Sequence, residues 1–225
     1  MRRRVRIAAA TAMLTLVPSA SAVEFGHPRR IDNSYLPLAK FARCELRGSE
    51  DGAKVRVVRT LLGRTRRFEH HGRAFRAAIV RDSEYEDGEL VERTLDYFAQ
   101  GDGGAVHYLG ERVDTYENGR VDGHEGSWLY GRDTNKLGVI MPAHPRVGMR
   151  WRAENVPGIT VERDRAVAVL GKVTVRGRIY RRVLRVRERS GGETEFKLYA
   201  PGVGNISERP PGGRVELVGC RERAD

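Results

Sequence analysis

Carboxyl side chains are the residues of this chain with the clearest capacity for chemistry. Glu111, Asp114, Asp122 and Glu125 fall in neighbouring predicted strands, which allows their side chains to approach one another. Two carboxyl groups facing a cleft at about 5 Å, or at about 6.5–9.5 Å, can hydrolyse a glycosidic bond. The chain has 30 acidic and 41 basic residues, however, so most carboxylates are expected to balance arginines. We therefore favour a protein without enzymatic activity and keep a hydrolase of unrecognised type as an alternative.

The histidines do not form a pattern that would bind a metal. His107 stands four residues before Glu111, a separation of about 13 Å along a strand, so the two cannot grip one ion. His70 and His71 are adjacent, and neighbouring strand residues point to opposite faces. We expect no metal and no cofactor, although a site assembled from distant segments stays open.

Nucleophile motifs are also missing. Ser127 lies in the sequence Glu-Gly-Ser-Trp-Leu, which is not the Gly-x-Ser-x-Gly of a nucleophile elbow, so we interpret it as a hydrogen-bonding hydroxyl. The two cysteines, Cys44 and Cys220, lie in predicted strands near opposite ends of the chain. An oxidising compartment favours a disulfide between them, which would tie the first strand to the last. Two buried, unpaired thiols are the alternative.

The N-terminus has the three parts of an export signal. Four arginines within the first six residues precede an apolar run from Ile7 to Val17, and Ala20-Ser21-Ala22 ends the segment. The sequence predicts a signal peptide over residues 1–22, helical in its apolar part and cleaved between Ala22 and Val23. The mature protein is then secreted, periplasmic or otherwise in the cell envelope, and no segment is long enough to span a membrane. An uncleaved basic tail is the alternative.

The elements that must position any site are strands. Alternating apolar residues and turn signals at Asp87-Gly88, Asp102-Gly103-Gly104, Asn118-Gly119 and Gly191-Gly192 predict about ten antiparallel strands. We expect an extended arm over residues 23–42 and a single β-rich domain over 43–225, with a long connection at 131–148. The predicted fold is all-β, a single curved sheet or barrel-like meander. A two-sheet sandwich is the alternative.

The aromatic residues are the best candidates for the wall of a pocket. In a curved sheet Tyr108, Trp128, Trp151 and Tyr199 could enclose a lipid or another apolar or amphipathic small molecule, with ordinary core packing as the alternative. The basic residues are scattered rather than clustered, and only five of them are lysine, so we expect no specific nucleic-acid partner. The oligomeric state is left open.

Five short motifs resemble a family of uncharacterised exported bacterial β-proteins. They are Ile31-Asp32-Asn33-Ser34-Tyr35-Leu36-Pro37-Leu38, Tyr108-Leu109-Gly110-Glu111, Glu125-Gly126-Ser127-Trp128, Ile140-Met141-Pro142 and Tyr199-Ala200-Pro201-Gly202-Val203-Gly204. The last is also similar to a turn in barrel-like domains near the lipoprotein-carrier (LolA-like) architecture. This chain departs from the family pattern at Ala39-Lys40-Phe41, where Pro-Gly and an aromatic residue are usual, and at His107, where Trp is common. The resemblance implies export and a β fold, and it brings no established activity.

Three functions are therefore compatible with the sequence. The first is an exported, non-enzymatic β-domain that binds an apolar or amphipathic ligand in its concave sheet. The second is a structural or protein-interaction module of the envelope, and the third is the hydrolase. A cavity of about 300 Å³ or more would favour the first.

Overall fold

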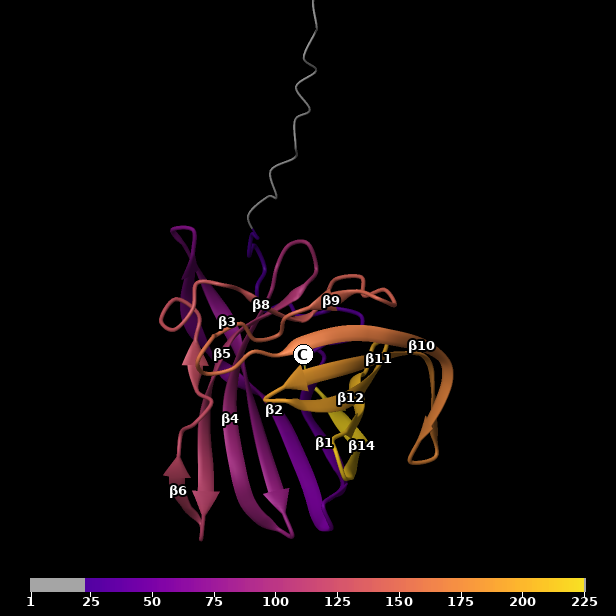
Figure 1. The fold of residues 1–225 in the computed structure, drawn as a ribbon. Helices are drawn as coiled ribbons and strands as arrows, with labels where there is room; N and C mark the ends of the chain where they lie inside the picture. The colour runs from indigo at the N-terminus through magenta and orange to yellow at the C-terminus, as the bar shows by residue number, and fades with distance from the viewer. Residues whose placement is uncertain (1–22, 225) are drawn as a thin grey trace, which may run out of the picture.

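The protein folds as one continuous antiparallel sheet (Figure 1). The computed structural model describes residues 23–224, so the predicted signal peptide and its helix lie outside the described residues. No helix occurs in the described part, and hence none there that could cross a bilayer. The strands are β1 (Phe41–Glu50), β2 (Ala53–His70), β3 (Arg73–Glu86), β4 (Glu89–Gln100), β5 (Val106–Glu117), β6 (Arg120–Gly123), β7 (Trp128–Leu129), β8 (Gly138–Met141), β9 (Arg150–Trp151), β10 (Arg163–Val175), β11 (Arg178–Ser190), β12 (Glu193–Ala200), β13 (Gly204–Arg209) and β14 (Gly213–Glu222).

This architecture confirms the all-β, antiparallel prediction, with more strands than the expected ten. The additional strands β7, β8 and β9 have two to four residues, too few to show alternation, and β8 lies inside the expected long connection at 131–148. The strand β13 was not predicted; it begins at Gly204, the last residue of the Tyr199–Gly204 motif. Because all strands belong to one sheet, the sandwich alternative is wrong.

The predicted hairpin turns are confirmed by the backbone. Asp87 and Gly88 have φ values of 48° and 101°, and Asn118 and Gly119 have values of 52° and 73°. These left-handed conformations match the twist of paired strands and favour Asn, Asp and Gly. Almost all neighbouring strands are therefore also neighbours in sequence.

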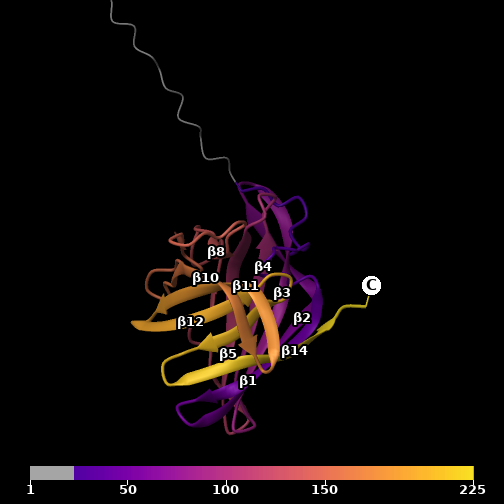
Figure 2. The same cartoon turned by 90° about the vertical axis from the view of Figure 1, so that its right-hand side faces the viewer.

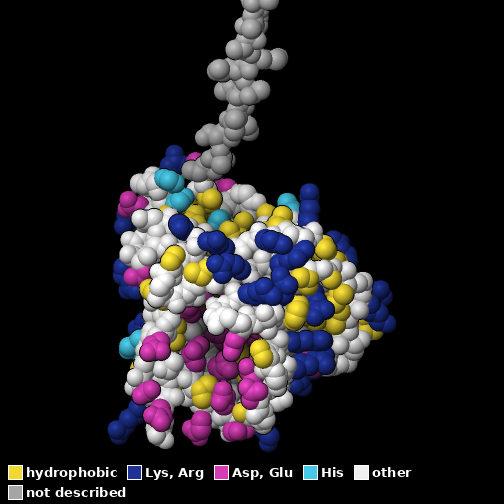
Figure 3. Space-filling view, in the orientation of Figure 1, with side chains coloured by type: hydrophobic (Ala, Val, Ile, Leu, Met, Phe, Trp, Pro, Cys, Tyr) yellow, Lys and Arg dark blue, Asp and Glu magenta, His cyan; other side chains and the backbone are white. Residues whose placement is uncertain are grey.

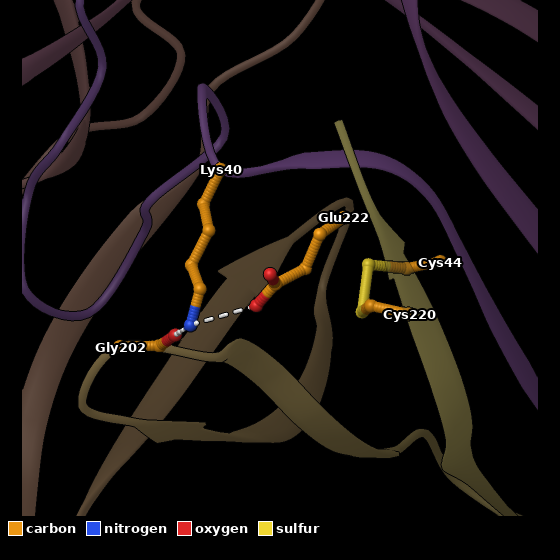
Figure 4. The surroundings of a disulfide bond; sticks show 5 residues. All are labelled: Lys40, Cys44, Gly202, Cys220 and Glu222. Atoms are coloured by element: carbon orange, nitrogen blue, oxygen red, sulfur yellow. Dashed lines mark hydrogen bonds and ion pairs between the residues drawn. A yellow bond between two sulfur atoms is a disulfide. The ribbon is translucent and has the colours of Figure 1, made fainter. Parts of the chain in front are cut away.

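The one pairing between distant strands joins the two ends of the domain. The sheet order β6-β5-β4-β3-β2-β1-β14-β13-β12-β11-β10-β9 places β1 beside β14. We call this junction the seam. Cys44 and Cys220 lie directly opposite each other in it and form the predicted disulfide. Beside the disulfide, Lys40 Nζ lies 3.4 Å from Glu222 Oε1 and donates to the Gly202 carbonyl oxygen at 3.2 Å, which ties the arm to the C-terminal strands (Figure 4).

The sheet folds over on itself in two limbs. Strands β10–β12 of the C-terminal limb (β9–β14) run across strands β2–β5 of the N-terminal limb (β1–β8), as Figures 1 and 2 show. The sheet does not close by strand pairing, but Val139 N of β8 donates to the Arg152 carbonyl oxygen just after β9 at 2.8 Å. A Cβ at Gly138 would overlap the Ala153 carbonyl oxygen, so this approach of the two limbs requires glycine.

Apolar side chains fill part of the space between the limbs. Val80, Phe98 and Tyr108 of the N-terminal limb pack with Leu184, Val186 and Tyr199 of the C-terminal limb. A second cluster, including Ile79, Tyr97 and Leu109, covers the opposite face of β3–β5, where Phe25 of the arm stacks on Phe75 at 4.2 Å. The parts of β3–β5 that carry these residues are thus buried on both faces. The rest of the space between the limbs holds two cavities.

Candidate functional site

Two connected cavities lie between the limbs. The smaller has a volume of about 310 Å³ and the larger a volume of about 400 Å³, and both are lined by Arg59, Glu162, Lys197 and Glu208. Leu36 and Leu38 of the arm, Val80, Phe98 and Ile140 give the smaller cavity an apolar wall. The larger cavity extends to hairpin ends at Glu50, Ser190, Glu193 and Pro210.

The walls of these cavities are strongly acidic. Seven carboxyl side chains line the larger cavity and six line the smaller, with two shared, against only Arg59 and Lys197 as basic residues. Figure 3 shows acidic side chains gathered around a hollow on the lower half of one face, with basic side chains above and to the side. A chain with a formal net charge of +11 therefore encloses a negative interior.

Arg59 on β2 joins two strands of the cavity wall. Its Nε donates to Asp82 Oδ2 and its Nη2 to Glu208 Oε1, both at 2.7 Å. Burial disfavours the charged guanidinium, but the charges of Glu208 and Asp82 outweigh it and raise the pKa of Arg59 well above its ordinary value. Burial alone would raise the pKa of Glu208, and the charges of Arg59 and Lys197 hold it below the usual range instead.

Lys197 on β12 likewise forms ion pairs with carboxylates, here on the C-terminal limb. Its Nζ lies 2.7 Å from Glu188 Oε2 and 3.8 Å from Glu195 Oε2. The other oxygen of Glu188 accepts a long hydrogen bond of 3.4 Å from the Tyr199 hydroxyl. These two partly buried cations thus neutralise only a fraction of the carboxylates around them.

Several remaining carboxyl groups are held close to a neutral state. Glu84 on β3 lies opposite Glu92 on β4, and burial together with the charge of Glu92 raises the pKa of Glu84 to about 7. Burial, aided by the charge of Asp82, also raises the pKa of Asp96 to about 7, although Asp96 accepts a hydrogen bond of 2.9 Å from the Tyr108 hydroxyl. A bound cation would favour the charged forms of these groups.

Glu111 and Glu154 form a second carboxyl pair in the smaller cavity. Burial and the charge of Glu154 raise the pKa of Glu111. Glu154 accepts hydrogen bonds from Trp128 Nε1 at 3.0 Å and from the Thr160 hydroxyl, one on each of its oxygens, which hold its side chain in place. The pair resembles a neutral acid donating to a fixed carboxylate more than an acid and a free base.

The predicted aromatic wall residues divide into two groups. Tyr108 and Tyr199 line the smaller cavity, each with its hydroxyl on a carboxylate. Trp128 is fully buried behind Tyr108, with ring centroids 5.4 Å apart, and lines neither cavity. Trp151 lies on β9 against the apolar core and is also absent from both cavity walls.

The carboxylates first considered from the sequence do not come together. Glu111 reaches the cavity, whereas Asp114, three residues later on the same strand, lies on the opposite face and pairs with His124 Nδ1 at 2.9 Å and Arg112 Nη2 at 3.1 Å. Asp122 and Glu125 are exposed. Ser127 has the hydrogen-bonding role expected of it, because its hydroxyl accepts from Val113 N at 2.8 Å.

The residues that sequence reasoning missed lie mostly on the C-terminal limb. Glu162, Glu188, Lys197 and Glu208 were not singled out, and neither was Arg59 of β2. The strand period could have indicated some of them. Lys197 is two residues from the buried Tyr199, and Glu188 is two residues from the buried Val186, so each charged residue shares the inward face of its strand. Charges in a region rich in arginine looked like a solvated surface.

Four of the five motifs quoted from the sequence line the smaller cavity, and the fifth packs behind its wall. Its wall includes Leu36 and Leu38 of the first motif, Tyr108 and Glu111 of the second, and one residue each of the Ile140 and Tyr199 motifs. The remaining motif supplies Trp128, which packs behind Tyr108. Backbone and side-chain bonds join the motifs: Asn33 Nδ2 donates to the Pro142 carbonyl oxygen at 3.1 Å, and Gly202 N donates to the Ser34 carbonyl oxygen at 2.7 Å.

Comparison with known proteins gives no relative, since no family model, curated protein or solved structure matches this chain. The family resemblance of the five motifs is therefore still a hypothesis, and the function must be argued from the site alone.

Proposed function

We propose that this protein is an exported, non-enzymatic binding domain whose cavities hold an amphipathic molecule that carries a cationic group. The supporting observation is the pair of joined cavities, 310 and 400 Å³ in volume, with an apolar and aromatic wall at one end and carboxylates at the other. These volumes are in the range of small-molecule sites. They also argue against an envelope module with a filled interior.

The charge of the walls decides which class of ligand fits. A wholly apolar lipid would bury ionisable carboxyl groups against hydrocarbon, and an anionic head group would meet further repulsion. An ammonium or guanidinium group beside Glu84, which has no basic partner within ion-pair distance in the described part of the chain, would relieve the repulsion from Glu92. The apolar portion would then lie along Leu36, Leu38 and Phe98.

Export fits the same proposal. The disulfide between Cys44 and Cys220 is the kind of bond that persists in an oxidising compartment. Together with the predicted signal over residues 1–22, it supports a protein that works in the periplasm, the envelope or the medium.

The test compares three probes of equal chain length: octylammonium, octanol and octanoate. Calorimetric titration at pH 8, where Glu84 is ionised, is expected to show binding of octylammonium and little or none of the other two. Glu84→Gln should weaken octylammonium binding about tenfold, or about 1.4 kcal/mol, because a charge-assisted contact is lost. Glu117→Gln, on the exposed end of β5, is the matched control and should bind as the wild type does.

Two results would contradict the proposal. One is binding of octanol or octanoate as tight as that of octylammonium, and the other is no binding of any of the three. Mass spectrometry of protein purified from its native compartment offers a second measurement, and amine-bearing amphiphiles are the expected co-purifying species.

The hydrolase alternative rests on the carboxyl pair Glu111 and Glu154. A carboxyl group with a raised pKa in a cavity is typical of a general acid. Hydrogen bonds to both oxygens hold Glu154 in the cavity wall, which disfavours its approach to a substrate as base or nucleophile, and we therefore place binding first.

A further inference from the structure

Three carboxyl groups on the C-terminal limb converge on one point. Glu162 precedes β10, Asp164 is on β10 and Glu188 is on β11, and one oxygen from each lies within 4.8 Å of the others. Asp164 and Glu188 are direct cross-strand partners. Glu162 is two residues before Asp164, and the short spacing brings its side chain to the same face.

The cluster, when ionised, carries more negative charge than neighbouring basic side chains neutralise. Asp164 is only 3% exposed, and its Oδ1 has no hydrogen-bond partner among residues 23–224. No basic side chain in this part of the chain lies within ion-pair distance of Glu162 or Asp164, since Lys197 contacts Glu188 and Glu195 instead. Like charges directly opposite each other destabilise a sheet, and a buried polar atom without a partner is costly.

We propose that Glu162, Asp164 and Glu188 form a binding site for one divalent cation of the calcium type. Ionised, the three carboxylates carry three negative charges. Lys197, which Glu188 shares with Glu195, offsets at most one of them, and a divalent ion would neutralise two more. Asp164 Oδ1 has no hydrogen-bond partner among residues 23–224, so this buried carboxyl group has bonding capacity left for an ion.

Ligand chemistry selects the ion. A set of oxygens without histidine or cysteine suits hard cations rather than zinc or copper. Three carboxylates from the protein favour Ca²⁺, because Mg²⁺ usually keeps more of its water and binds through one or two carboxylates. The three ligand oxygens lie within 4.8 Å of one another, close enough to contact one such ion. Water would complete the coordination from the cavity side.

This site is separable from the ligand proposal. Glu162 and Glu188 line the larger cavity, but Asp164 lines neither cavity. An Asp164 variant therefore tests the ion, and a Glu84 variant tests the ammonium group.

Thermal unfolding with and without added ion is the first experiment. Ca²⁺ at ~10 mM, above the ~10⁻⁴–10⁻³ M Kd typical of extracellular calcium modules, is expected to raise the Tm of the wild type by about 5–10 °C. Asp164→Asn, which keeps the shape of the side chain and removes one repelling charge, should fold and show no rise. Glu162→Gln is a second variant with the same expectation, and Glu84→Gln is the control that should keep the full response.

Terbium luminescence locates the ion. Trp151 on β9 is the direct cross-strand partner of Asp164, so Tb³⁺ in the site should emit when tryptophan is excited, and Ca²⁺ should displace it. Trp151→Phe is expected to lose most of this emission and to keep the Tm response to Ca²⁺. Unchanged emission in that variant would place the ion elsewhere.

The proposal is overturned if Ca²⁺ leaves the Tm of the wild type unchanged, or if Asp164→Asn responds as strongly as the wild type. A response to Mg²⁺ with none to Ca²⁺ would overturn the assignment of the ion.

Discussion

Arg59 offers the sharpest test of how the acidic interior is held together. Its guanidinium donates to Asp82 and Glu208 at 2.7 Å, and its side chain is 27% exposed. Arg59→Met keeps most of the length of the side chain and removes the charge. Both carboxylates then stay in the cavity wall without their common partner.

The expected cost follows from the burial of the pair. Breaking a fully buried ion pair by removing one partner costs about 3–5 kcal/mol, and the partial exposure of Arg59 favours the lower end, about 3 kcal/mol. For a domain of this size that loss corresponds to a fall in Tm of about 6–12 °C. Because the pKa of Glu208 is lowered in the wild type, the stabilisation is present above about pH 5 and disappears as the pH falls through the lowered value.

Urea unfolding followed by tryptophan fluorescence at pH 8 and at pH 4 measures both effects. The difference between Arg59→Met and the wild type should be about 3 kcal/mol at pH 8 and clearly smaller at pH 4, where protonation begins to neutralise the unpaired carboxylates of the variant. Arg56→Met is the matched control, since Arg56 is on the same strand but stacks on Tyr85 at 3.9 Å and faces away from the cavities. An equal loss at both pH values would show that Arg59 acts through packing, and the electrostatic reasoning would be refuted.

Two further predictions concern the seam and the buried acid Asp96. Replacing Cys44 and Cys220 together by alanine removes a cross-link over 176 residues, which stabilises the fold by about 5 kcal/mol in the chain-entropy model. We expect the free energy of unfolding in urea to fall by about 2–5 kcal/mol and the m-value to increase. A loss below about 1 kcal/mol would contradict it. The folded-state pKa of Asp96, about 7, is above the unfolded value of about 3.9, so the wild type should lose stability as the pH rises between these values. Asp96→Asn should flatten the profile of unfolding free energy against pH, by up to about 1.4 kcal/mol per pH unit, and parallel profiles would sink this prediction.

More of the fold than of the candidate site could be predicted from the sequence. Turn residues such as Asp87 and Asn118 act locally, and their backbone conformation depends on a few neighbours, so the hairpins were predictable. Cys44 and Cys220 gave the one long-range pairing, because a covalent bond can join distant segments whatever lies between them. The number of short strands was not predictable, since two residues show no period.

The site depended on which face of each strand points inward. In β3 both Ile79 and Val80 are buried, so the apolar pattern did not distinguish the cavity face from the outer face. The inward carboxylates Glu84 and Glu188 then looked like ordinary surface charges. Only the crossing of the two limbs brings them together, and that crossing is set by the curvature of the whole sheet.

The seam also orders events in time during folding. Every other junction joins strands that are consecutive or, as in the pairing of β7 and β8 with β5, close along the chain, but the free edge of β1 must wait for β14, the last of these strands. Cys44 therefore remains without its mate until almost the entire polypeptide has been delivered. Oxidation of this pair therefore records that the chain has been made through β14, and a product truncated before β14 would be left with an unpaired Cys44.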